Sequence, residues 1–239
     1  LHIKPFTNTK TKLMKKSLLI GLVALTLFSG CRQQNDKSAK QKTGNPVDNV
    51  QLDSEIMTPE ALWSFGRVSG VNLSPDKTTI LFGTSFYEVE GNSGNRDLFV
   101  MPVKGGEAEN ITNTSGSEFN ARWRPDGKKI GYLSAETGST QLWEMNPDGS
   151  DKTQISSIEG GINGFEYAPN QKKILYIKAV KLDKSVQDIH PDLPKANARI
   201  ETDLMYRHWD QWHDYKYSHI FVADYSPQGL SNSTDIMKG

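Results

Sequence analysis

The sequence predicts an all-β chain that forms part of a β-propeller, with about two and a half to three four-stranded blades. One block of strand, turn and strand recurs three times, and a proline followed by Asp or Asn marks each turn. The spacing is regular, because Pro125 to Pro169 and Leu98 to Leu142 both measure 44 residues. A period of about 40–50 residues with four short strands per unit is typical of a propeller blade. The three blocks are Val71–Phe82, Ala121–Tyr132 and Phe165–Tyr176.

A short helix is predicted just before the first block, and the ordered region 57–239 begins there. Thr58 is a suitable helix N-cap, Pro59 fits the first helical position, and Glu60 favours the positive end of the helix dipole. We expect this helix to lead the chain into the first blade.

In each block, apolar residues stand two and four positions before the proline, as Leu73 and Val71 do in the first. Side chains alternate along a strand, so both lie on one face. The proline fixes φ in the turn, and the Asp or Asn side chain bonds to its own backbone. Third strands are predicted at 97–102 and 141–146, and fourth strands near 110–112 and 154–156.

Two blades carry insertions. The stretch from the turn proline to the third strand is 17 residues in the second copy and 23 in the first, so six extra residues lie around 88–95. In the third copy it is 52 residues, from Pro169 to Phe221, so about 35 extra residues lie between Lys178 and Ser218. Insertions in repeat proteins map to loops and often to the binding face.

The first 56 residues predict export and a membrane anchor. Residues 1–13 precede Met14 and are expected to be mis-assigned upstream sequence. Residues 14–30 have the basic start, short apolar run and small-residue exit of a signal peptide, and Cys31 follows as in a lipoprotein. We expect lipid attachment at Cys31, a flexible tether over 31–56, and a protein facing the periplasm or cell surface. An ordinary signal peptide that contains a cysteine is the alternative.

Composition and motifs exclude several functions for this stretch of sequence. Lys plus Arg equals Asp plus Glu at 28 each, which gives no electrostatic case for nucleic acid. No Gly-x-Ser-x-Gly nucleophile motif occurs, and His208 and His213 are five apart, off the helical spacing of a metal site. No catalytic residue, metal ligand or cofactor is expected.

The long insertion is the candidate binding region because it concentrates aromatic and charged residues. Aromatics give rigid contact area, and a carboxylate can bind an amine. Asp210 is the favoured carboxylate, because apolar neighbours on both sides, Trp209 and Trp212, would lower the local dielectric and strengthen an ion pair. Asp203 and Glu201 are its competitors, and a structural salt bridge to Arg207 is the alternative role. A loop pinned to the blades by its aromatics is the alternative interpretation of the segment. The predicted substrate contacts are Tyr206, Arg207, Trp209, Asp210 and Trp212.

At this point the sequence resembles a known family. Thr58–Phe82 is similar to the start of the propeller in the prolyl oligopeptidase family, acylaminoacyl-peptidase branch. Gln141–Gly164 and Asp203–Trp212 resemble the bacterial type-5 dipeptidyl peptidases within it. The resemblance implies a serine peptidase with an N-terminal propeller and a C-terminal α/β-hydrolase domain that carries the Ser, Asp and His triad.

By that resemblance, the chain is the N-terminal propeller part, and it should be inactive alone because the triad has no counterpart in it. Its implied role is to gate and bind peptide substrates, with the missing hydrolase domain as its partner. Two other classes stay open. One is a non-enzymatic periplasmic propeller that binds protein, and the other is a surface lipoprotein that captures glycans through the aromatic cluster.

Overall fold

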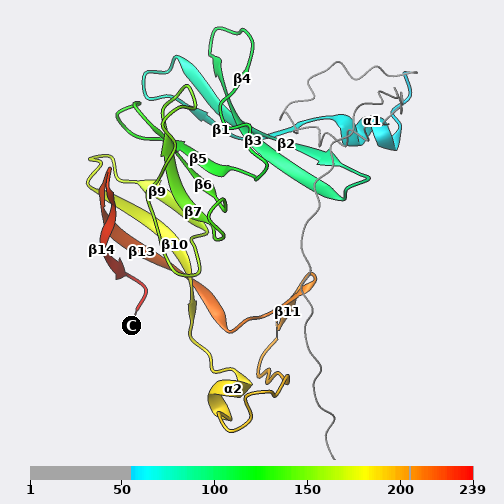
Figure 1. Ribbon diagram of the computed structural model, residues 1–239, viewed down its shortest axis with the longest axis vertical. Helices are drawn as coiled ribbons and strands as arrows, with labels where there is room; N and C mark the ends of the chain where they lie inside the picture. The colour runs from blue at the N-terminus through cyan, green and yellow to red at the C-terminus, as the bar shows by residue number, and fades with distance from the viewer. Residues whose placement is uncertain (1–54, 205, 239) are drawn as a thin grey trace, which may run out of the picture. The chain divides into compact units, whose positions relative to one another are not determined.

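The computed structural model describes residues 55–204 and 206–238, so Cys31, the predicted signal peptide 14–30 and nearly all of the tether 31–56 lie outside the described residues. Three four-stranded antiparallel sheets follow one another along the chain (Figure 1). Within each sheet the strands are adjacent in chain order, which is the blade topology that the repeats predict. The predicted partial propeller is therefore confirmed.

The helices and strands are as follows. Helix α1 spans Pro59–Ser64, and sheet A consists of β1 (Arg67–Leu73), β2 (Thr79–Glu88), β3 (Ser93–Pro102) and β4 (Glu109–Asn110). Sheet B consists of β5 (Phe119–Trp123), β6 (Ile130–Ser134), β7 (Gln141–Met145) and β8 (Thr153–Gln154). Sheet C consists of β9 (Gly164–Tyr167), β10 (Lys173–Lys181), β13 (Lys216–Ser226) and β14 (Gly229–Asp235). Between β10 and β13 lie α2 (Val186–Ile189) and the hairpin β11 (Arg207–His208) and β12 (Gln211–Trp212).

Helix α1 forms where the sequence predicts it. The Thr58 side chain accepts a hydrogen bond from the Ala61 amide at 3.2 Å, and Pro59 occupies the first turn. These contacts satisfy amide groups that the first turn of a helix leaves without intrahelical partners.

The turn between the first and second strands has the same backbone shape in all three blades. Its third residue has a positive φ each time: 60° at Lys77, 70° at Gly127 and 56° at Gln171. Only the second blade places glycine there, which is the residue that adopts this conformation without steric cost. The turn geometry is thus imposed on lysine and glutamine in the other two blades.

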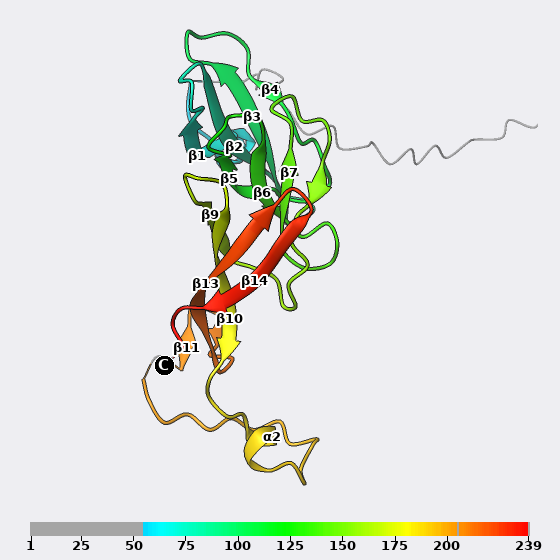
Figure 2. The ribbon, with the colours of Figure 1, turned by 90° about the vertical axis from the view of Figure 1, so that its left-hand side faces the viewer.

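Both insertions lie within the predicted ranges, and the structure shows what each one forms. The six extra residues of blade one lengthen a hairpin, since β2 and β3 pair without a break from Thr79 opposite Pro102 to Glu88 opposite Ser93. In blade three, β10 and β13 stay paired as far as Lys181 and Lys216, so the loop outside the sheet covers only 182–215. Strand β14 completes sheet C (Figure 2), so the described residues contain three blades, the upper value of the predicted range.

The apolar core lies between consecutive sheets. One cluster joins sheets A and B and includes Leu81, Ile130 and Tyr132. A second joins sheets B and C and includes Leu142 and Tyr167. Each sheet therefore uses its neighbour to cover a face, as blades do in repeat architectures.

The predicted one-sided strand pattern is only partly matched by burial. Phe165 and Tyr167 of β9 are 4% and 6% exposed, as a core strand requires. Their counterparts Val71 and Leu73 in β1 are 64% and 49% exposed. The difference arises because no described sheet covers that face of sheet A.

Candidate functional site

The loop 182–215 leaves sheet C at the end of β10 and returns at the start of β13 (Figure 1). Its base is fastened by the Tyr217 hydroxyl, which donates to Asp183 at 2.6 Å, and by the Leu182 amide, which donates to the Tyr215 carbonyl at 3.1 Å. Beyond this base, Ser185 and Asp188 form a capping box that starts α2. The chain thus leaves the blade through a hydrogen-bonded base.

The five predicted contact residues cluster around the hairpin β11–β12. Tyr206 stacks on Trp212 with ring centroids 5.8 Å apart, and the Arg207 guanidinium lies 5.3 Å from the Trp212 ring. Trp209 stands in the turn with φ of 55° and is 89% exposed. Asp210 follows it, also exposed. Tyr206 and Trp212 therefore pack on each other and on Arg207 within the hairpin, whereas the base of the loop is held to sheet C by Tyr217.

The ion pairs expected of Asp210 and Arg207 are not found in the described part of the chain. Within the described residues, Asp210 makes no hydrogen bond or ion pair, and Arg207 pairs with no carboxylate. The exposed turn gives Asp210 no apolar shielding, so the low-dielectric setting predicted for it is not found. Contact between the five residues and a substrate stays a prediction.

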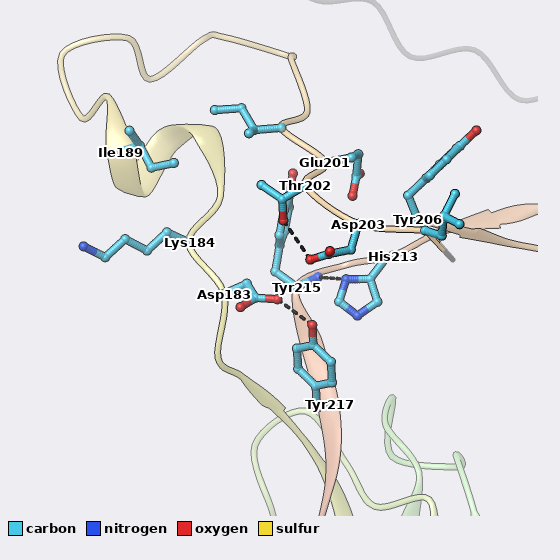
Figure 3. A pocket seen from close by; sticks show the side chains of 12 residues that line it. Asp183, Lys184, Ile189, Glu201, Thr202, Asp203, Tyr206, His213, Tyr215 and Tyr217 are labelled. Atoms are coloured by element: carbon cyan, nitrogen blue, oxygen red, sulfur yellow. Dashed lines mark hydrogen bonds between the residues drawn. The ribbon is translucent and has the colours of Figure 1, made fainter.

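A pocket of about 390 Å³ lies at the base of the loop, beside rather than on the hairpin turn (Figure 3). Only Tyr206 of the five predicted residues lines it. The pocket is bounded by Asp183, Lys184, Ile189, Ile200, Glu201, Thr202, Asp203, Leu204, Tyr206, His213, Tyr215 and Tyr217.

Negative charge dominates this pocket. Three carboxylates line it, those of Asp183, Glu201 and Asp203, whereas the amino group of Lys184 points away from them in Figure 3. The hydrogen bond from Tyr217 to Asp183 raises the pKa of the tyrosine, and the charges of Asp183 and Asp203 add to the effect. The same field that opposes ionisation of a phenol favours a bound cation.

None of the three carboxylates is firmly neutralised by a cation. Asp183 accepts from the Tyr217 hydroxyl, and Asp203 accepts from the Thr202 hydroxyl at 3.1 Å. Glu201 has the Arg199 guanidinium at 3.8 Å, which is beyond normal hydrogen-bond length. This pocket therefore retains acceptor capacity for an ammonium group, which offers three donors.

Aromatic rings form the other wall of the pocket. The His213 ring lies 4.9 Å from the Tyr217 ring, and its Nδ1 accepts a hydrogen bond from the Tyr215 amide at 3.2 Å. With Nδ1 acting as acceptor, a neutral His213 carries its proton on Nε2. The pocket combines carboxylates with ring faces, which suits an organic ammonium ion attached to an apolar group.

One His–Asp pair elsewhere has the composition of a catalytic dyad, but its position is that of a structural contact between two strands. His219 Nδ1 lies 2.7 Å from the Asp235 carboxylate, and His219 is 6% exposed. His219 occupies the position in the third strand that Asp97 occupies in blade one. Asp97 accepts a hydrogen bond from Asn110 on the fourth strand of that blade. In both blades the pair joins the third and fourth strands, so the contact belongs to the repeat.

Two absences apply to the part of the chain that the structure describes. Its His, Cys, Asp and Glu side chains form no group of three that could hold a metal ion. None of its helices has the length and hydropathy needed to cross a membrane.

Comparison with known proteins identifies the family. Residues 63–206 match the family model of the TolB beta propeller domain. The chain belongs to this family.

The chain is also homologous to dipeptidyl-peptidase 5 in its propeller region. It is 43% identical over 185 residues to that protein of Porphyromonas gingivalis, which covers 77% of this chain and 27% of the relative. The chain is 33% identical over 226 residues to the dipeptidyl-peptidase 5 of Porphyromonas endodontalis, and this match covers 95% of this chain and 32% of the relative. This TolB-type propeller therefore spans about a third or less of the length of these relatives.

Among solved structures, the acylaminoacyl peptidase of Pyrococcus horikoshii superposes with a TM-score of 0.53. The match is 16% identical in sequence and covers 72% of this chain and 25% of that chain. At this identity the likeness concerns the propeller fold alone.

Sequence reasoning missed the centre of the pocket. Asp203 and Glu201 were foreseen only as competitors of Asp210, and the contact between Asp183 and Tyr217 was not foreseen. The two partners are 34 residues apart and meet because β10 and β13 remain paired beyond the predicted ends of the strands. The length of a strand ladder depends on pairing, which the period of the repeat does not report.

Proposed function

We propose that this chain is the N-terminal propeller part of an exported serine dipeptidyl or acylaminoacyl peptidase, where it gates and binds peptide substrates. The observation that carries the proposal is the 43% identity to dipeptidyl-peptidase 5 over 185 residues. The catalytic groups belong to sequence that the chain does not contain, so its own contribution is selection and positioning of the peptide.

The pocket at the base of the loop is the proposed binding site for the free amino terminus of the peptide. Its carboxylates offer charge-assisted hydrogen bonds to an α-ammonium group, and the rings of Tyr206 and Tyr217 can contact the first side chain. An ammonium held at a fixed point lets an exopeptidase measure a set distance to the scissile bond, which is a positioning effect.

The test uses the full chain and one peptide in two forms, Ala-Ala-Phe-amide and its N-acetyl derivative. We expect the free amine to bind at least tenfold more tightly, which corresponds to about 1.4 kcal/mol, and Asp203→Asn to remove most of that preference. Asp214→Asn is the matched control, because Asp214 pairs with Lys216 and does not line the pocket. Calorimetric titration of the three proteins with both peptide forms measures six dissociation constants.

The same titration separates the two carboxylates considered for this role. Loss of the preference in Asp210→Asn but not in Asp203→Asn would move the ammonium site to the hairpin turn. Equal binding of both peptide forms by the wild-type chain would contradict an amine-binding role for the loop altogether.

We propose in addition that Cys31 is lipidated and tethers the exported protein to a membrane. The support is the arrangement of a basic start, a short apolar run and a small-residue exit before the cysteine. We expect Cys31→Ser to move the protein from the membrane fraction to the soluble fraction of the cells. Membrane association that survives this substitution would count against lipidation.

A further inference from the structure

A second candidate site surrounds Arg67, near the N-terminal end of the described residues. The Arg67 guanidinium lies beside two aromatic rings, 4.7 Å from that of Trp63 and 4.6 Å from that of Tyr87. The two rings also meet edge to face, with centroids 5.6 Å apart. Trp63 comes from α1 and Tyr87 from the far end of β2, which lie beside each other in Figure 1.

The ring contacts hold the guanidinium without using its N–H donors. Within the described residues, the Arg67 side chain makes no hydrogen bond or ion pair. Four of the other described arginines use their N–H groups on protein oxygens: Arg96, Arg122, Arg124 and Arg199. Arg67 is therefore a cation held against aromatic rings, and its N–H donors are not used by the fold.

The Arg67 side chain lines a pocket of about 480 Å³. Besides Trp63, Arg67 and Tyr87, the pocket is lined by Glu88, Val89, Asn92, Ser93 and Gly94 from the tip of the β2–β3 hairpin. Trp63, Tyr87 and Val89 are 41%, 43% and 64% exposed, so apolar surface borders the cation. The six residues that lengthen this hairpin over that of sheet B create this tip.

We propose that this pocket, the Arg67 pocket, binds a carboxylate carried by a peptide ligand, with the adjoining apolar group of the ligand against Trp63 and Val89. A guanidinium presents parallel N–H donors that match the two oxygens of a carboxylate, and the contacts with Trp63 and Tyr87 restrict its position in advance. Pre-organisation of this kind lowers the entropy cost of binding.

The placement of the pocket supports a ligand role. The tip of the β2–β3 hairpin and the loop 182–215 are the same connection, between second and third strands, in blades one and three. In blade two the hairpin is shorter than in blade one, since Ile130 pairs with Met145 fifteen residues later, whereas Ile80 pairs with Met101 twenty-one residues later. Insertions that recur at one connection of a repeat mark one face, often the binding face.

The test measures binding of N-acetyl-phenylalanine and its amide to the full chain by ligand-observed NMR titration at low salt. We expect the acid to bind at least tenfold more tightly than the amide. Arg67→Gln should abolish this preference. Arg67→Lys should keep only part of it, because lysine retains the charge but not the paired donors. Arg122→Gln is the matched control, since Arg122 pairs with Glu166 away from this pocket.

Each outcome decides the proposal. A preference for the acid that disappears in Arg67→Gln and persists in Arg122→Gln supports it. Equal binding of acid and amide, no binding of either, or a preference that survives Arg67→Gln overturns it. The probe has no amino group, so failure here leaves the ammonium pocket and the proposed peptidase role untouched.

Discussion

Single residues show where the fold tolerates an unfavourable charge. Glu118 and Asp97 are 2% and 1% exposed, and burial raises the pKa of each carboxyl. The Thr114 hydroxyl donates to Glu118 Oε1 at 2.5 Å, but Oε2 has no hydrogen-bond partner within the described residues. The residue one repeat later is Ile162, which is 0% exposed. An ionised acid is therefore not required at this position of a blade.

We expect Glu118→Gln to stabilise the chain at neutral pH. The raised pKa means that the unfolded chain ionises first as pH rises, so the wild type loses stability from about pH 4.5 upward through the folded pKa. The variant lacks this loss, and its advantage should shrink towards pH 4. Urea unfolding at fixed protein concentration and several pH values measures it; an advantage that does not vary with pH would contradict this account.

At the scale of the element, the three strand–turn–strand units share one turn but differ in how well their residues suit it. Lys77 and Gln171 hold φ of 60° and 56°, where a side chain crowds the backbone, whereas Gly127 fills the same place in blade two. The hydrogen bond from the turn residue to the carbonyl three positions before it is 2.8 Å in each unit. The sheet thus imposes the turn whatever residue occupies it.

We expect Lys77→Gly to raise the free energy of unfolding by about 0.5–1 kcal/mol, because relief of left-handed strain exceeds the added flexibility of glycine. Gln171→Gly should act in the same direction. Gly127→Ala is the reverse control and should destabilise by a similar amount. Urea unfolding of the three variants measures the effects, and stabilisation by Gly127→Ala would show that turn strain is not the cause.

For the whole molecule, the decisive feature is the uncovered side of sheet A. Val68, Val71 and Leu73 of β1 are 59%, 64% and 49% exposed. The opposite face of the same sheet buries Leu81 completely against sheet B. A blade depends on a neighbour on both sides, and contiguous exposed apolar surface favours association.

We expect the isolated chain to associate as its concentration rises. Replacing Val71 and Leu73 together with threonine should shift the chain towards monomer, since threonine has the β-branched shape that strands favour but adds a polar hydroxyl. Sedimentation velocity over a tenfold concentration range measures the change. A monodisperse wild-type monomer with a sharp cooperative melt would disprove dependence on a covering partner.

Much of the fold can be predicted from local features of the sequence. The 44-residue period, the Pro-Asp turns and the alternating apolar positions specify strands, turns and blade order. These features depend on backbone preference and on a side-chain period of two, both of which act over a few residues. Thr58 and Pro59 start α1 for the same local reason, as the N-cap hydrogen bond confirms.

The two pockets depend on contacts that only the tertiary structure determines. Arg67 meets Tyr87 because β1 pairs with β2, and Asp183 meets Tyr217 because β10 and β13 continue as a ladder past the predicted strand ends. Asp210 was favoured from its neighbours in sequence, yet the turn exposes it to water. The sequence by itself determined the repeating blade, since its signals are local. Strand pairing decided which charges face a pocket, since register brings together residues that are distant along the chain.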